Sequence, residues 1–137
     1  VKDLTEIVVA HGSPYVAQTT MIGNFKDFHQ KAHKAIYTEG PTFVNVLCPC
    51  PRGWQYPAEL LPEICRLAVD TCIWPMYEVE NGEYHLTYMP KKKLPVEEFM
   101  KLQGRFRHCF KPGNEWTIEE AQKYVDEKWE ALLAKCK

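Results

Sequence analysis

The sequence has no long hydrophobic run and no marked excess of charge of either sign. No apolar stretch approaches the roughly 18 residues of a membrane-spanning helix, and 17 basic against 18 acidic side chains give a formal net charge of −1. A membrane protein and a general nucleic-acid binder are therefore disfavoured. Glycine is scarce, at 7 of 137 residues, and no phosphate-binding loop or dinucleotide-binding fingerprint occurs. The 45% hydrophobic content instead suits one globular unit with a moderate core.

A secretory signal is also missing, because no charged segment followed by an apolar one opens the sequence. Outside a secretory context, cysteines are best read as reduced thiols of a cytoplasmic protein. The six are Cys48, Cys50, Cys65, Cys72, Cys109 and Cys136. The sequence begins with Val1 and enters a helical pattern almost at once, so we expect it to be part of a longer protein.

Two helices and two strands alternate in the first third of the sequence. Asp3 and Glu6 have capping-box spacing for a helix over 4–11, and an apolar strand is expected over 14–17. The pattern then predicts a helix over 24–38 and a strand over 42–48. The apolar face of the second helix would consist of Phe25, Phe28, Ala32, Ala35 and Ile36. Strands this apolar, alternating with helices, predict parallel pairing in a doubly wound sheet.

The remainder is expected to form a hairpin and several helices. Proline tolerance places the start of a third helix between Pro57 and Pro62. Asn81-Gly82 favours a tight hairpin turn between strands at 77–79 and 84–88. A helix over 96–103 and a long final helix capped by Thr117 and Glu120 complete the pattern. The predicted fold class is α/β, a mainly parallel sheet followed by a β-hairpin and a helical C-terminal extension.

The most informative segment is Cys48-Pro49-Cys50-Pro51-Arg52-Gly53-Trp54. It follows an apolar strand that its prolines prevent from continuing, and ligands of open α/β sheets bind at the carboxyl ends of strands. Two interpretations stay open for Cys48 and Cys50, which are either small buried hydrophobic residues or metal ligands. Cys-x-Cys alone cannot complete a zinc site, so a cluster sharing one cysteine with ligands from elsewhere fits better. For the other four cysteines we favour packing.

Two further groups of residues have a functional and a simpler interpretation. His29 and His33 are four residues apart and could share a metal, but a solvated helix surface is favoured. Residues 91–111 are basic, and their cations are either a solvated or intersubunit face or a docking surface for an acidic protein. These cations are Lys91, Lys92, Lys93, Lys101, Arg105, Arg107 and Lys111.

Several segments together resemble one family in the same order. They are Val9-Ala10-His11-Gly12-Ser13-Pro14-Tyr15-Val16-Ala17, Glu39-Gly40-Pro41, Pro49-Cys50-Pro51-Arg52-Gly53-Trp54, Arg66-Leu67-Ala68-Val69, Trp74-Pro75-Met76-Tyr77-Glu78 and Lys101-Leu102-Gln103-Gly104-Arg105-Phe106. The sequence resembles the C-terminal part of the thiamine-diphosphate-binding β subunit of the 2-oxoacid:ferredoxin oxidoreductases. With Pro90-Lys91-Lys92-Lys93, it is most similar to the pyruvate enzymes.

The resemblance implies a role for one of the two loop thiols. Cys50 matches the family's fourth cysteine ligand to the [4Fe-4S] cluster nearest the thiamine. Cys48 stands where the family does not require a thiol, and it would at most lie next to that ligand without binding the cluster. The implied catalytic groups, the other cluster ligands and the Mg²⁺ and diphosphate motif lie upstream and do not occur here. Residues 1–57 would be the last βα units of the thiamine-diphosphate-binding domain, and 58–137 an extension in the same structural unit.

The resemblance also implies a reaction and a set of partners. The family converts pyruvate, coenzyme A and oxidised ferredoxin to acetyl-coenzyme A, CO₂ and reduced ferredoxin, or runs the reverse synthesis. The implied partners are the rest of the β subunit, subunits of α, γ and δ type, and ferredoxin. The alternative is a non-catalytic module that docks partners through its basic segment.

Overall fold

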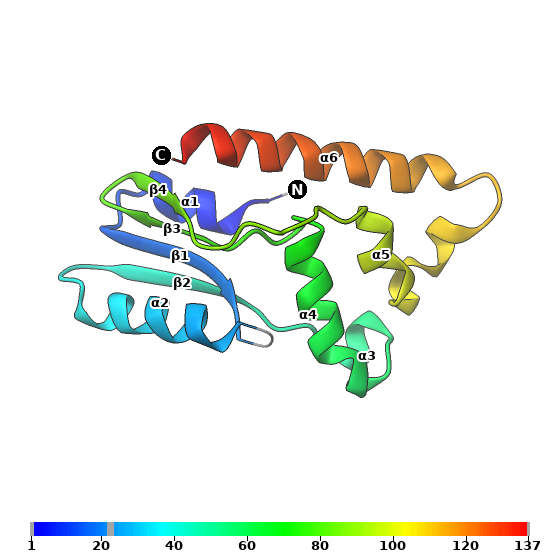
Figure 1. Ribbon diagram of the computed structural model, residues 1–137, viewed down its shortest axis with the longest axis horizontal. Helices are drawn as coiled ribbons and strands as arrows, with labels where there is room; N and C mark the ends of the chain where they lie inside the picture. The colour runs from blue at the N-terminus through cyan, green and yellow to red at the C-terminus, as the bar shows by residue number, and fades with distance from the viewer. Residues whose placement is uncertain (1, 22–23, 137) are drawn as a thin grey trace.

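The computed structural model describes residues 2–21 and 24–136 and shows a four-stranded sheet with helices around it (Figure 1). The strands are β1 (Tyr15–Thr20), β2 (Thr42–Leu47), β3 (Tyr77–Glu80) and β4 (Glu83–Leu86). The helices are α1 (Leu4–Ala10), α2 (Phe25–Tyr37), α3 (Pro51–Trp54), α4 (Leu61–Asp70), α5 (Val96–Lys101) and α6 (Glu115–Lys135). Two 3₁₀ helices, η1 (Ala58–Leu60) and η2 (Gly104–Phe110), complete the fold.

The sheet is mixed, with strand order β2-β1-β3-β4. β1 and β2 are parallel, as predicted, and the α/β class and the hairpin are confirmed. The hairpin joins the same sheet by pairing β3 antiparallel to β1, an arrangement that the sequence does not reveal. Within the described residues the sheet is therefore not mainly parallel, and β1 is a central strand with all six of its residues buried.

Local sequence signals account for most element boundaries. Asp3 caps α1, since its Oδ1 accepts the amide of Glu6 at 3.1 Å, and Asn81 and Gly82 adopt the positive φ angles of the predicted turn. The predicted cap of the last helix is wrong by three residues. α6 begins at Glu115, after Asn114, and the Thr117 hydroxyl donates to the Asn114 carbonyl at 2.7 Å inside the first turn. Neither η2 nor α3 was predicted.

The orientation of α2 corrects the sequence analysis. Phe25 and Ile36, expected on a packing face, are 65% and 75% exposed, whereas Asp27 and Lys31 are buried. Asp27 accepts a hydrogen bond from Thr19 of β1 and Lys31 donates one to the Gln18 carbonyl of β1, which draws this side of the helix toward the sheet. Phe28, Ala32 and Ala35 of the expected face are half-buried, so this face packs in part, and Phe25 and Ile36 at its edges are open to solvent.

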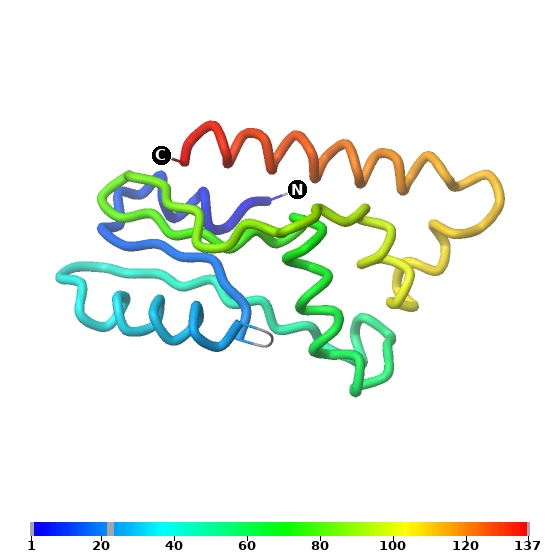
Figure 2. Tube along the Cα trace, viewed as in Figure 1, coloured from blue at the N-terminus to red at the C-terminus, as the bar shows by residue number. Residues whose placement is uncertain are grey.

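The main core lies on the other side of the sheet and at its end. α4, α5 and α6 bury Ile64, Leu67, Phe99, Val125 and Trp129 together with β-strand residues. α6 runs the length of the molecule beside the hairpin and α1, and α2 flanks the opposite side (Figures 1 and 2). The segment after β2 leaves the sheet and forms α3 at the far end, next to α4. The two cysteines of that segment are thereby placed beyond the carboxyl ends of the parallel strands.

Candidate functional site

The loop after β2 turns at once into a single turn of helix. Cys50 occupies the N-cap of α3, and Pro51 takes the first helical position, where a missing amide proton costs nothing. The Trp54 amide donates to the Cys50 carbonyl at 2.8 Å. At the other end Gln55 closes the turn in the left-handed conformation, with φ 59°.

The thiol of Cys50 is both exposed and hydrogen-bonded. The backbone N–H of Gly53 donates to Cys50 Sγ at 3.4 Å. Amide donors of this kind stabilise the charged form of a cysteine ligand and tune a bound cluster. Cys50 therefore presents a sulfur that can serve as one ligand to a metal centre outside this segment.

Cys48 is also exposed, so the interpretation of both loop cysteines as small buried hydrophobic residues is wrong. Pro49, which lies between the two cysteines, is held by a hydrogen bond from a buried tyrosine. Tyr56, only 6% exposed, donates its hydroxyl hydrogen to the Pro49 carbonyl at 3.0 Å, and burial raises the pKa of Tyr56. A buried proline and its tyrosine thus fix the loop while the flanking thiols face outward.

The other cysteines lie mainly in the core, as expected. Cys65, Cys72 and Cys109 are buried, and Cys136 is half-buried. Burial raises the pKa of Cys65, and it raises that of Cys72 to about 11. Such thiols are poor nucleophiles and poor ligands at neutral pH.

No group of three or more histidine, cysteine, aspartate or glutamate side chains that could hold a metal ion occurs in residues 2–21 and 24–136. His29 and His33 lie exposed on α2, and the ring of His33 packs on Tyr37 with centroids 4.5 Å apart. This agrees with the favoured solvated surface. A cluster with four ligands, one of them Cys50, would need at least two from outside these residues.

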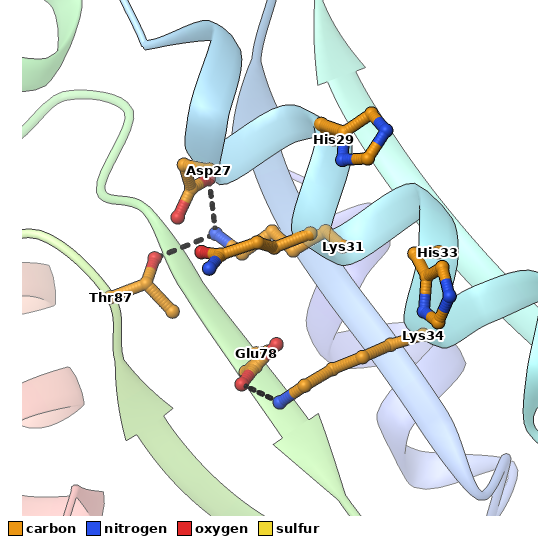
Figure 3. A pocket seen from close by; sticks show the side chains of 8 residues that line it. Asp27, His29, Lys31, His33, Lys34, Glu78 and Thr87 are labelled. Atoms are coloured by element: carbon orange, nitrogen blue, oxygen red, sulfur yellow. Dashed lines mark hydrogen bonds and ion pairs between the residues drawn. The ribbon is translucent and has the colours of Figure 1, made fainter.

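A buried polar network beneath α2 was missed by sequence reasoning (Figure 3). Lys31, 1% exposed, donates to Asp27 Oδ2 at 2.8 Å, to Thr87 Oγ1 at 2.7 Å and to the Gln18 carbonyl at 2.9 Å. Burial lowers the pKa of Lys31, against the opposing effect of Asp27. The only sequence signal was an acid–base pair four residues apart, a spacing more often found on solvated helices.

A second carboxylate continues this network toward β3. The side chain of Glu78 accepts from Tyr15 Oη at 2.7 Å and from Lys34 Nζ at 2.5 Å. A hollow of about 360 Å³ is bordered by Glu78 and Lys34 together with His29 and His33. Because each charge in it has a partner of opposite sign, we interpret the network as the attachment of α2 to the sheet.

Three cations of the basic segment are engaged with other side chains. Lys93 pairs with Asp126 of α6, Lys101 pairs with Glu98, and the guanidinium of Arg105 stacks on Trp54. Lys91 and Lys92 are exposed in the loop before α5. The charge open to an acidic partner is therefore smaller than the sequence suggested.

No helix in the described parts of the chain is long and apolar enough to cross a membrane.

Comparison with known proteins gives a consistent result, although no family model matches the chain. It is 51% identical over 131 residues to pyruvate synthase subunit PorB of Methanocaldococcus jannaschii. It is 44% identical over 133 residues to the subunit of the same name in Thermotoga maritima. Ketoisovalerate oxidoreductase subunit VorB of Pyrococcus furiosus is 45% identical over 133 residues.

Each of these alignments covers 96% of this chain but only 41–42% of the relative. The chain thus spans about two fifths of the length of the curated relatives that it matches. The chain belongs to the family of the pyruvate synthase PorB and ketoisovalerate oxidoreductase VorB subunits, and it corresponds to a C-terminal portion of them.

Proposed function

We propose that this chain is the cluster-ligating C-terminal part of a 2-oxoacid:ferredoxin oxidoreductase β subunit, and that Cys50 supplies one ligand of a [4Fe-4S] cluster near thiamine diphosphate. The observation that carries the proposal is the exposed Cys50 thiol at the N-cap of α3, with the Gly53 amide directed at its sulfur. Similarity to PorB and VorB subunits over nearly the whole chain supports the enzyme class.

The residues around Cys50 fit the requirements of such a ligand. Pro49 and Pro51 stiffen the backbone on both sides, and Tyr56 holds the Pro49 carbonyl in place. Trp54 packs edge-on against Phe99 at 6.1 Å between ring centroids, which covers the inner side of the turn. The chain's own contribution is to fix the sulfur and donate one N–H to it.

The remaining groups of the reaction are assigned to segments outside this chain. Thiamine diphosphate with Mg²⁺, held mainly by the upstream part of the subunit, supplies the nucleophilic carbon and electron sink for oxidative decarboxylation. A cluster held in part by Cys50 would supply one-electron transfer toward ferredoxin, and coenzyme A would accept the acyl group. Pyruvate is the proposed 2-oxoacid, supported by the 51% identity to a pyruvate synthase subunit. We also propose that the complex includes further subunits of α, γ and δ type and that it lies in the cytoplasm.

The test replaces Cys50 by Ala in the full-length subunit within its complex, with Cys48→Ala as the matched control two residues away. Cys50→Ala is expected to lose at least one iron per cluster and to change the low-temperature EPR signal of the reduced protein. Cys48→Ala should keep both iron content and signal. Unchanged iron and EPR in Cys50→Ala would contradict the proposal. An iron-free wild-type complex that binds its partner through Lys91 and Lys92 would favour the non-catalytic docking module.

A further inference from the structure

The segment Gln103-Gly104-Arg105-Phe106 packs against α3, although about fifty residues separate them in the sequence. The guanidinium carbon of Arg105 lies 3.6 Å from the centroid of the Trp54 ring and 4.5 Å from that of Phe106. Burial lowers the pKa of Arg105, yet a guanidinium stays charged at neutral pH. A partly desolvated cation over an aromatic face makes a strong contact of its kind.

Gln103 holds the guanidinium in this position. Its side chain is almost fully buried, with the residue 2% exposed. Its Nε2 donates to the Phe99 carbonyl at 2.6 Å, and its Oε1 accepts from Arg105 Nε at 2.8 Å. The orientation of Arg105 over Trp54 is therefore set by the Gln103 side chain, which burial and its own hydrogen bond to the Phe99 carbonyl hold in place.

Gly104 permits the close approach of the two segments. Its amide donates to the Gln55 carbonyl at 2.8 Å. A Cβ at position 104 would lie 2.8 Å from the Gln55 Cβ and 2.9 Å from that carbonyl oxygen, closer than such atoms can pack. Glycine is required here for lack of space, since its φ is not among the positive values of this chain. The close contact fixes Gln55, which ends α3 in the left-handed conformation.

α3 depends on these contacts because a single helical turn is unstable alone. Trp54 is held between Phe99 of α5 and the guanidinium of Arg105. The same residue donates its amide to the Cys50 carbonyl at 2.8 Å, and its neighbour Gly53 donates to the Cys50 sulfur. A displacement of Trp54 therefore moves both backbone donors that define the position of Cys50.

We propose that Gln103, Gly104 and Arg105 form a clasp that positions Cys50 through Trp54, with Arg105 as the principal positioning residue. The clasp keeps the Gly53 amide directed at the sulfur. This inference rests on the proposed role of Cys50 as a cluster ligand. It assigns a role to a three-residue segment that lies far from the loop cysteines in sequence.

The test compares Arg105→Gln with Arg107→Gln, an exposed arginine of the same 3₁₀ helix, in the full-length subunit within its complex. Two quantities are measured: hydrogen exchange of the peptide covering residues 50–56, and the rate of iron release to a ferrous chelator. Loss of a partly buried cation–π contact is expected to accelerate both on the order of 10-fold. Arg107→Gln should match the wild type. Arg105→Lys, which keeps the charge without the planar stack, should fall between.

Several outcomes decide the matter. Wild-type exchange and iron release in Arg105→Gln would overturn the clasp, as would equal effects of Arg105→Gln and Arg107→Gln. Should Arg105→Gln not fold, Gly104→Ala replaces it, and the same local acceleration is expected from the crowded Gln55. Failure of the proposed function is seen separately, because Cys50→Ala would then retain its iron. Faster exchange with unchanged iron release would show that the clasp holds the turn without positioning a cluster ligand, and would overturn the inference.

Discussion

The buried Lys31–Asp27 pair allows a quantitative test of how α2 is attached to the sheet. Lys31 is 1% exposed and its ammonium donates to three oxygens. Asp27 Oδ2 also accepts from the Thr19 hydroxyl at 2.5 Å. Removing one partner of a buried ion pair leaves an uncompensated charge, which costs about 3–5 kcal/mol. We expect Lys31→Met and Asp27→Leu each to lower the free energy of unfolding by an amount in this range.

The double variant measures the coupling free energy between Lys31 and Asp27, apart from what each side chain contributes through its other contacts. Because both charges disappear together, Lys31→Met/Asp27→Leu should be less destabilised than the sum of the two single variants, with a coupling free energy of roughly 1–3 kcal/mol. The control is Lys123→Met, which breaks the Lys123–Glu127 pair with the same four-residue spacing on the exposed surface of α6. An exposed pair of this kind contributes about 0.3–0.5 kcal/mol.

Urea unfolding followed by far-ultraviolet circular dichroism measures these differences, with the slope of the unfolding curve checked for each variant. The reasoning would be refuted if Lys31→Met cost no more than Lys123→Met. Additivity of the two single variants would equally refute it, since two groups that share a hydrogen bond at 2.8 Å should be coupled. Either result would mean that α2 is held by contacts other than this network.

Two further predictions concern the exposed thiols and the exposed lysines. In protein freed of iron, the exposed Cys48 and Cys50 should react with iodoacetamide at pH 8. Cys72, whose pKa burial raises to about 11, should react about 100-fold more slowly or not at all. Peptide mass spectrometry measures the labelling of each cysteine, and equal labelling would contradict the assigned burial. Replacing Lys91 and Lys92 with Glu should slow ferredoxin reduction at low salt but not at high salt. Unaltered kinetics at low ionic strength would exclude these lysines from docking.

Local signals were enough to predict much of the fold. The Asp3 cap of α1, the Asn81-Gly82 turn and the parallel pairing of β1 with β2 follow from short stretches of sequence, and the structure confirms all three. The same kind of signal misplaced the start of α6, because Thr117 has the spacing of a capping residue but the helix begins before it. Short-range patterns predict an element more securely than its end.

For the site, the sequence identified the loop but not what holds it. Prolines around two cysteines after an apolar strand mark the loop, and the family resemblance singles out Cys50 within it. The structure places the Cys50 thiol at the surface with an amide at the sulfur. The stack of Arg105 on Trp54 could not be predicted, because no periodicity relates residues so far apart. The sequence predicted Arg105 as one of the cations of the basic segment, whereas in the structure its guanidinium packs on the Trp54 ring.

The sequence by itself determined most of the helices and strands, where the cysteine loop lies, and which family the chain resembles, because these depend on neighbouring residues and on their order. Only the tertiary structure decided which face of α2 is buried, how the hairpin joins the sheet and what fixes α3. The apolar pattern of a helix gives the direction of its apolar face. Burial depends on which other segment covers that face, and here the hydrogen bonds of Lys31 and Asp27 turned the charged side inward.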